Sequence, residues 1–111
     1  YVEDDKCGFV LAIGSLTDMF AGAGVAQDTL AIDQIPKGLP IYVFSGDEDP
    51  IHGKRKDLDR MVAAYRKYGI QKLDYRYYEG GRHEMFNEIN KKEVVRDLIE
   101  WLNEILKGTY L

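Results

Sequence analysis

The chain has 111 residues, of which 45% are hydrophobic and 31% charged, so it forms one globular domain or part of one. Its formal net charge of -4 argues against a nucleic-acid partner, because nucleic-acid-binding proteins carry basic patches. The sequence contains no run of about 18 apolar residues, so we expect no transmembrane segment.

The first residues carry two hints about the origin of the chain. The single cysteine, Cys7, cannot form an internal disulfide, which favours a reducing compartment and predicts a cytoplasmic protein. Residues 1–6 lack the basic and apolar segments of a signal peptide. The chain starts with Tyr1 instead of Met, so we expect it to begin partway through a longer one.

The first third of the chain is predicted to be loop and helix. Residues 1–8 are polar and read as a loop. Apolar residues at helical spacing predict a helix over 13–20, which the neighbouring glycines weaken, and a second short helix over 27–32. Two prolines and a glycine make 35–40 a linker.

The rest of the chain reads as strand, helix, strand and helix, over residues 41–44, 54–68, 72–78 and 91–106. The first strand is continuously apolar, as expected of a strand covered on both faces, whereas the second is more polar and alternating. A helix between two strands predicts a parallel pair with a right-handed crossover, and thus an α/β fold.

Single residues refine these elements. Gly69 is expected to cap the first of the two helices, whose apolar stripe includes Val62. Trp101 is expected to pack the last helix against the sheet. The tyrosines of the second strand, Tyr75, Tyr77 and Tyr78, suit a half-exposed strand.

Two loops follow the predicted strands and carry residues suited to catalysis. Asp49 lies three residues after Gly46, which lets the chain turn off the first strand. His83 lies on a loop that opens with Gly80-Gly81. Ligands of parallel sheets bind beyond the carboxyl ends of the strands, where both loops lie. An acid bonded to one ring nitrogen of a histidine leaves the other nitrogen free as a base.

A purely structural interpretation of the same residues stays open. The acidic run that includes Asp47 and Asp49 can be a solvated turn, with Asp49 capping the next helix. His83 can be an ordinary surface histidine, and His52 a surface or helix-start residue.

Three segments in this order carry a family resemblance: residues 39–50 with a Gly-x-x-Asp turn, residues 78–88 with a Gly-x-x-His-Glu loop, and the helix through 95–102. From residue 35 to residue 102 the chain resembles the C-terminal part of an α/β-hydrolase. It is most similar to the serine aminopeptidases, monoacylglycerol lipases and lysophospholipases.

The resemblance also implies a division of the chain. Residues 4–20, with Cys7-Gly8-Phe9, look like the end of the cap that covers the active site in these enzymes. We therefore interpret residues 1–34 as the end of the cap and a helical connection, and residues 35–111 as the C-terminal part of the hydrolase core.

In this family the triad acid would be Asp49, with Asp47 as its nearest competitor, and the base would be His83. The family's nucleophilic serine sits in a Gly-x-Ser-x-Gly turn upstream of the cap. Neither serine of this chain, Ser15 or Ser45, lies in such a turn, so we expect the nucleophile upstream and the chain alone to be inactive. Family members need no metal or organic cofactor.

Three functions follow as hypotheses. The first is a serine hydrolase that cleaves a small-molecule or lipid carboxylic ester, of which this chain supplies Asp49 and His83. The second is a stand-alone, non-catalytic α/β module that binds a partner or oligomerises to cover its sheet edges. The third is a peptidase or amidase of the same fold. In the first case the sheet would be covered by the remainder of the hydrolase chain or by another copy.

Overall fold

A computed structural model describes residues 3–26, 28–51 and 55–109 of the chain. It consists of two compact units, Tyr1–Gln34 and Ile35–Leu111, which are treated separately below. Three positions singled out from the sequence lie outside the described residues: His52 and the predicted helix starts at Gln27 and Lys54.

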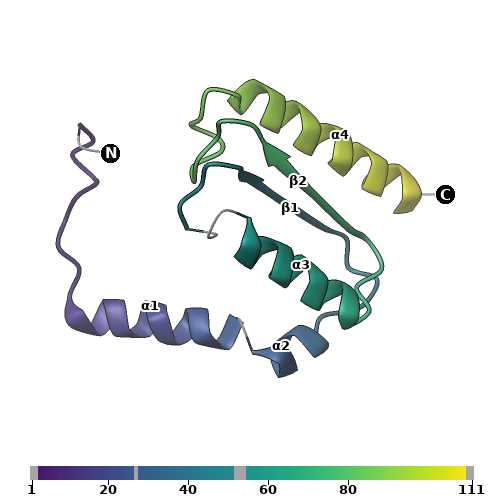
Figure 1. The fold of residues 1–111 in the computed structure, drawn as a ribbon, viewed down its shortest axis with the longest axis horizontal. Coiled ribbons are helices and arrows are strands. Elements are labelled where there is room, and N and C mark those ends of the chain that lie inside the picture. The colour runs from purple at the N-terminus through teal and green to yellow at the C-terminus, as the bar shows by residue number, and fades with distance from the viewer. Residues whose placement is uncertain (1–2, 27, 52–54, 110–111) are drawn as a thin grey trace. The chain divides into compact units, whose positions relative to one another are not determined.

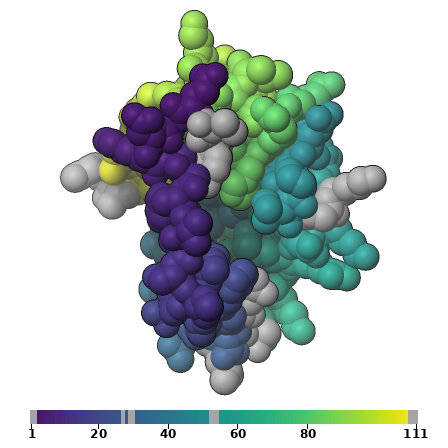
Figure 2. Space-filling model, turned by 90° about the vertical axis from the view of Figure 1, so that its left-hand side faces the viewer, coloured from purple at the N-terminus to yellow at the C-terminus, as the bar shows by residue number. Residues whose placement is uncertain are grey.

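The first unit contains helix α1 (Ile13–Ala26) and the short helix α2 (Thr29–Asp33). Helix α1 continues through Gly22 and Gly24 to Ala26 although these glycines were expected to weaken it, because a glycine costs a helix only about 1 kcal/mol and the alanines beside Gly22 favour it. None of its side chains is buried, and Ile13, Met19, Phe20 and Val25 are exposed. The helix belongs to the purple to blue part of the surface in Figure 2. Among the described residues, no helix has the length and apolar character needed to cross a bilayer.

The second unit is a small parallel sheet between two helices. Strands β1 (Ile41–Gly46) and β2 (Leu73–Tyr78) pair in parallel, with Ile41 opposite Leu73 and Gly46 opposite Tyr78. Helices α3 (Lys56–Lys67) and α4 (Lys91–Thr109) lie on opposite faces of this sheet (Figure 1). The predicted element order, the parallel pairing and the mixed α/β class are therefore confirmed.

The backbone conformations of Arg55 and Gly69 determine where α3 begins and ends. The helix starts two residues later than predicted, because Arg55 adopts a left-handed conformation with φ 72° and takes the N-cap position. At the other end Gly69 has φ 86°, and its N–H donates to the carbonyl of Arg66 over 3.0 Å. The N–H of Ile70 donates to the carbonyl of Tyr65 over 3.1 Å, which completes a Schellman motif and confirms the expected glycine cap.

The core of this unit lies between the sheet and α4. Val94 is fully buried and clusters with Tyr78 and Met85, against which Phe44 packs. Although helices lie on both faces of the sheet, β1 is only half-buried over residues 41–44, because in the described part of the chain it pairs with β2 alone and its other edge has no strand.

Helix α4 docks on the sheet through its aromatic residue, as predicted. The Trp101 ring stacks on Tyr42 with centroids 5.4 Å apart, and its indole N–H donates to a carboxylate oxygen of Asp74 over 2.9 Å. The neighbouring apolar stripe of the helix stays exposed: Val95, Ile99, Leu102 and Leu106.

A polar network also joins β2 to α4. Asp97, with 8% of its surface exposed, accepts a bond of 2.9 Å from the Tyr78 hydroxyl and pairs with Arg76 and Arg96. Burial alone would raise the pKa of the Asp97 carboxyl, but the bonds from Tyr78 and Arg96 and the nearby arginine charges outweigh it and lower that pKa. Tyr78 is only 2% exposed, so the expected half-exposed position is wrong for this tyrosine.

We expect Asp97→Asn to lower the free energy of unfolding at pH 7 by about 2 kcal/mol, because two arginines and a tyrosine lose a charged acceptor. Folding lowers the pKa of Asp97, so its ionised form stabilises the fold above the carboxyl pKa of the unfolded chain, about 3.9. That contribution is lost as the pH falls through the still lower pKa of the folded state.

Urea unfolding between pH 7 and pH 3 measures the effect. The stability gap between the unsubstituted chain and Asp97→Asn should narrow below about pH 4. Asp57→Asn, at an exposed pair with Arg60, is the matched control and should shift stability by less than about 0.5 kcal/mol. A gap for Asp97→Asn that is the same at both ends of the pH range contradicts the prediction.

Candidate active site

Asp49 is a buried carboxylate on the loop that leaves β1. Only 6% of its surface is exposed. One carboxylate oxygen, Oδ1, accepts the N–H of Ile51 over 2.8 Å, which closes an Asx turn and holds the side chain in place. The other oxygen, Oδ2, lies 2.9 Å from Nδ1 of His83 and 3.4 Å from the Ser45 hydroxyl. The carboxylate is therefore held by its own loop and faces the histidine.

His83 meets this carboxylate with one ring nitrogen and leaves the other open. An ionised carboxylate can only accept a hydrogen bond, so the contact with Asp49 requires the proton on Nδ1. In the neutral ring Nε2 then carries the lone pair, and it has no hydrogen-bond partner among the described residues. With 64% of its side chain exposed, His83 can present this nitrogen to a substrate or to another residue.

The competing acid, Asp47, bonds to Gly80 and Arg55 instead of His83. Its Oδ1 accepts the N–H of Gly80 over 2.8 Å, and its Oδ2 lies 3.6 Å from a guanidinium nitrogen of Arg55. Asp47 thus ties the start of the histidine loop to the start of α3. The structure brings Asp49, and not Asp47, against His83.

Two glycines allow the acid loop and the histidine loop to touch. A Cβ on Gly46 would overlap the carbonyl group of Gly81, and a Cβ on Gly81 would lie 3.2 Å from the Cα of Gly46. The N–H of Glu48 donates to the Gly81 carbonyl over 3.0 Å across the same contact. Gly46 has no positive φ, so the sequence-based reason for this glycine needs correction: it supplies space for the second loop, and no special turn conformation.

The histidine loop is closed by bonds within itself. Arg82 pairs with Glu88 over 3.2 Å, and the Asn87 amide donates to Glu84 over 2.8 Å. Sequence reasoning did not single out Asn90, whose amide donates to the carbonyl of Glu79 over 3.3 Å and joins the loop to the start of α4. An Asn directly before a long amphipathic helix is a cap signal that could have identified it.

The sequence analysis also did not predict the contacts of Tyr77 with Arg55 and Asp59, which join β2 to α3. The Arg55 guanidinium lies 4.3 Å from the centre of the Tyr77 ring, and the Tyr77 hydroxyl donates to Asp59 over 3.1 Å. Burial and this bond to Asp59 raise the pKa of Tyr77 to about 12, so the hydroxyl stays a donor at neutral pH. Arg55 also has a left-handed φ of 72°, a conformation that is unfavourable for a residue with a side chain, and its contacts with Tyr77 help to hold it there at the start of α3.

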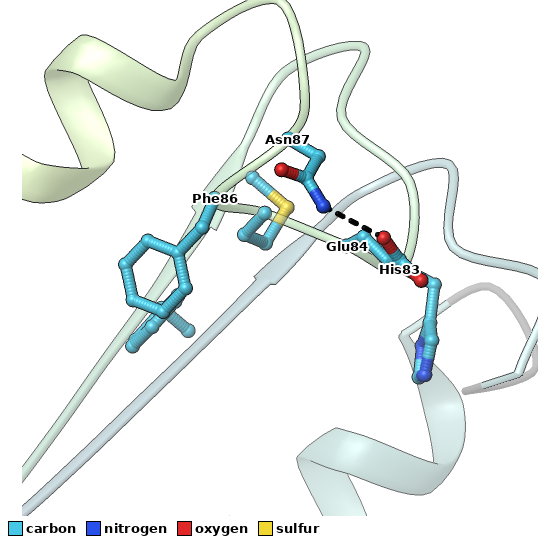
Figure 3. Close-up of a pocket in the computed structure, with 6 residues that line it drawn as sticks. His83, Glu84, Phe86 and Asn87 are labelled. Carbon is cyan, nitrogen blue, oxygen red and sulfur yellow. Dashed lines mark hydrogen bonds between the residues drawn. The ribbon is translucent and has the colours of Figure 1, made fainter. Parts of the chain in front are cut away.

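A hollow of about 310 Å³ lies beside the histidine. Phe44, Met85 and Phe86 supply apolar walls. Figure 3 shows His83 and Phe86 on opposite sides of the hollow, with the bonded Glu84–Asn87 pair between them. An apolar group could therefore lie next to the imidazole.

The two serines do not complete a nucleophilic site in the described residues. Ser45 is buried, and its hydroxyl donates to the carbonyl of Gly46 over 3.3 Å and faces Asp49, not the free nitrogen of His83. Ser15 lies in the first turn of α1, without a preceding strand. No three His, Cys, Asp or Glu side chains of the described chain come together as metal ligands.

The comparisons with known proteins bear on the fold. The structure is similar to part of an esterase with the α/β-hydrolase fold. That esterase is a highly thermostable carboxyl esterase from Bacillus coagulans, solved in complex with glycerol, and the match has a TM-score of 0.84 at 24% sequence identity. It covers 94% of this chain and 34% of the esterase chain, so this chain spans about a third of that protein. No protein-family model and no curated protein matches the sequence.

We expect Gly46→Ala to lower the free energy of unfolding by about 2 kcal/mol or more, because the added methyl group would overlap the Gly81 carbonyl. Gly38→Ala is the matched control: nothing lies within 4 Å of its added Cβ, so its stability should be unchanged or slightly higher. Urea unfolding of both variants provides the test. Equal stabilities for the two variants would show that the two loops do not depend on this contact.

Proposed function

We propose that this chain supplies the acid and the base of a serine hydrolase that cleaves carboxylic esters. The observation that carries the proposal is the 2.9 Å contact between Oδ2 of Asp49 and Nδ1 of His83, which leaves Nε2 open. The likeness in fold to part of a carboxyl esterase supports it. The nucleophilic serine would come from outside these 111 residues, because neither Ser15 nor Ser45 lies on a turn between strand and helix.

In the proposed reaction, the serine hydroxyl attacks the ester carbonyl while Nε2 of His83 takes its proton. The same proton passes to the departing alcohol, which leaves an acyl-enzyme. Water then attacks the carbonyl of the acyl-enzyme while Nε2 of His83 takes its proton. The proton passes to the serine oxygen as the acyl–serine bond breaks, which releases the carboxylic acid. Asp49 holds the ring with the proton on Nδ1 and stabilises the imidazolium that forms in each half-reaction.

Within this class, we propose a monoacylglycerol lipase or lysophospholipase type of substrate. The order of the Gly-x-x-Asp turn at Gly46 and the histidine loop at His83 resembles that group. The apolar hollow beside His83, with Phe44 and Phe86 in its walls, would suit an acyl or alkyl group. Residues 1–34 would then be the end of a cap, and the single Cys7 fits a cytoplasmic enzyme.

The sheet also indicates what must accompany the chain in this function. In the described residues β1 pairs with β2 alone, so one of its edges offers unpaired backbone groups. We propose that the remainder of the hydrolase, or a second copy of this chain, supplies a strand there.

In the protein that carries this chain, Asp49→Asn should lower kcat for a short-chain ester by about four orders of magnitude, because the amide no longer selects the tautomer with the proton on Nδ1. Asp57→Asn, exposed on α3, should leave kcat unchanged. A loss of less than about tenfold for Asp49→Asn, or a larger loss for Asp47→Asn, would assign the acid elsewhere.

A fluorophosphonate probe tests the position of the nucleophile. We expect peptide mapping of the labelled protein to find the adduct on a serine outside residues 1–111. The 111-residue chain alone should stay unlabelled, because Ser45 is buried and faces Asp49, and Ser15 lies in a helix without a preceding strand. Saturable labelling of Ser15 or Ser45 that depends on His83 contradicts the proposal.

A further inference from the structure

The Tyr78 hydroxyl belongs to a chain of oxygen atoms that runs from Tyr42 on β1 to Asp97 on α4. It lies 3.2 Å from the Tyr42 hydroxyl and donates to Oδ2 of Asp97 over 2.9 Å. Burial raises the pKa of Tyr78, and the bonds to Tyr42 and Asp97 raise it further, so the phenol keeps its proton and remains a donor. The tyrosine side chain therefore has one fixed position.

The partner of this hydroxyl is fixed in turn by charge. Oδ1 of Asp97 accepts two bonds from the Arg96 guanidinium, at 3.0 and 3.2 Å, and Oδ2 pairs with Arg76. Arg76 also bonds to Glu93 over 2.7 Å and lies 4.9 Å from the centre of the Tyr78 ring. A carboxylate that is held by two arginines makes a rigid anchor on α4 for the end of β2.

The backbone of the same tyrosine holds both loops of the site. The carbonyl oxygen of Tyr78 accepts the N–H of Asp47 over 3.0 Å, at the start of the acid loop. It also accepts the N–H of Gly81 over 3.3 Å, at the start of the histidine loop. Any movement of Tyr78 is therefore passed to both Asp49 and His83.

From this arrangement we propose that Tyr78 and Asp97 form a positioning pair that sets the distance between Asp49 and His83. The pair touches neither the substrate nor the reacting atoms, and it acts through the Tyr78 carbonyl. The inference rests on the proposed function, because it gives the two residues a role in turnover by the Asp49–His83 site.

The test uses Tyr78→Phe and Asp97→Asn in the protein that carries this chain. Each should lower kcat for a short-chain ester by about tenfold or more, because small displacements of a catalytic group are costly. KM should change by less than about twofold, since no substrate contact is removed. Tyr75→Phe is the matched control: this tyrosine lies on the same strand, is exposed and should keep full activity.

A second readout follows His83 directly. The 15N signals of the imidazole, assigned by their loss in His83→Gln, report which nitrogen carries the proton. In the unsubstituted protein we expect the proton on Nδ1, and in Tyr78→Phe and Asp97→Asn a mixture of the two tautomers. Tyr75→Phe should match the unsubstituted protein. A purely structural role of the pair would lower thermal stability and leave these signals unchanged.

The outcomes separate this inference from the proposed function. Folded Tyr78→Phe protein with unchanged kcat and unchanged His83 signals overturns the positioning role, and so does an equal loss in Tyr75→Phe. If Tyr78→Phe does not fold, Asp97→Asn decides the question, because it leaves the Tyr78 side chain itself unchanged. An Asp49→Asn variant that alters neither turnover nor the His83 signals overturns the proposed function itself.

Discussion

The close contact between Gly46 and Gly81 is the constraint on which the site depends. Each glycine sits at the start of a loop: a Cβ on Gly46 would overlap the Gly81 carbonyl, and a Cβ on Gly81 would lie 3.2 Å from the Gly46 Cα. Because the two backbones touch, the carboxylate of Asp49 reaches the ring of His83 although the residues are 34 positions apart in the chain. A larger residue at Gly46 would push the loops apart and lengthen that bond, so backbone packing controls the distance between Asp49 and His83.

The end of β2 connects this contact to both helices. Tyr77 and Tyr78 are consecutive and therefore point to opposite faces of the sheet. Tyr77 bonds to Asp59 on α3, whereas Tyr78 bonds to Asp97 on α4. The strand is thus held from both sides just before the histidine loop begins. Such double anchoring suits a loop that must keep an imidazole in place while most of its side chain is exposed.

Much of the fold could be predicted from local patterns. The apolar run of β1, the amphipathic helices and Gly69 each carry a signal that depends on neighbours in sequence, and the structure confirms them. Boundaries were less predictable: α3 starts late because of the backbone conformation of Arg55, and α1 runs on because tolerated glycines do not stop it. The burial of Tyr78 was missed, since strand alternation alone does not tell which face will meet a helix.

For the site, the sequence supplied the candidates, because an acid and a histidine placed just beyond parallel strands must lie at the same sheet edge. It left Asp47 and Asp49 as competitors. The choice between them depends on which oxygen faces the ring, and this follows from the Asx turn at Asp49 and from the bond that engages Asp47 with Gly80. The Asx turn is local, but the Asp47–Gly80 bond and the Asp49–His83 contact join residues 33 and 34 positions apart, so no local pattern encodes them and they become visible only in the folded chain.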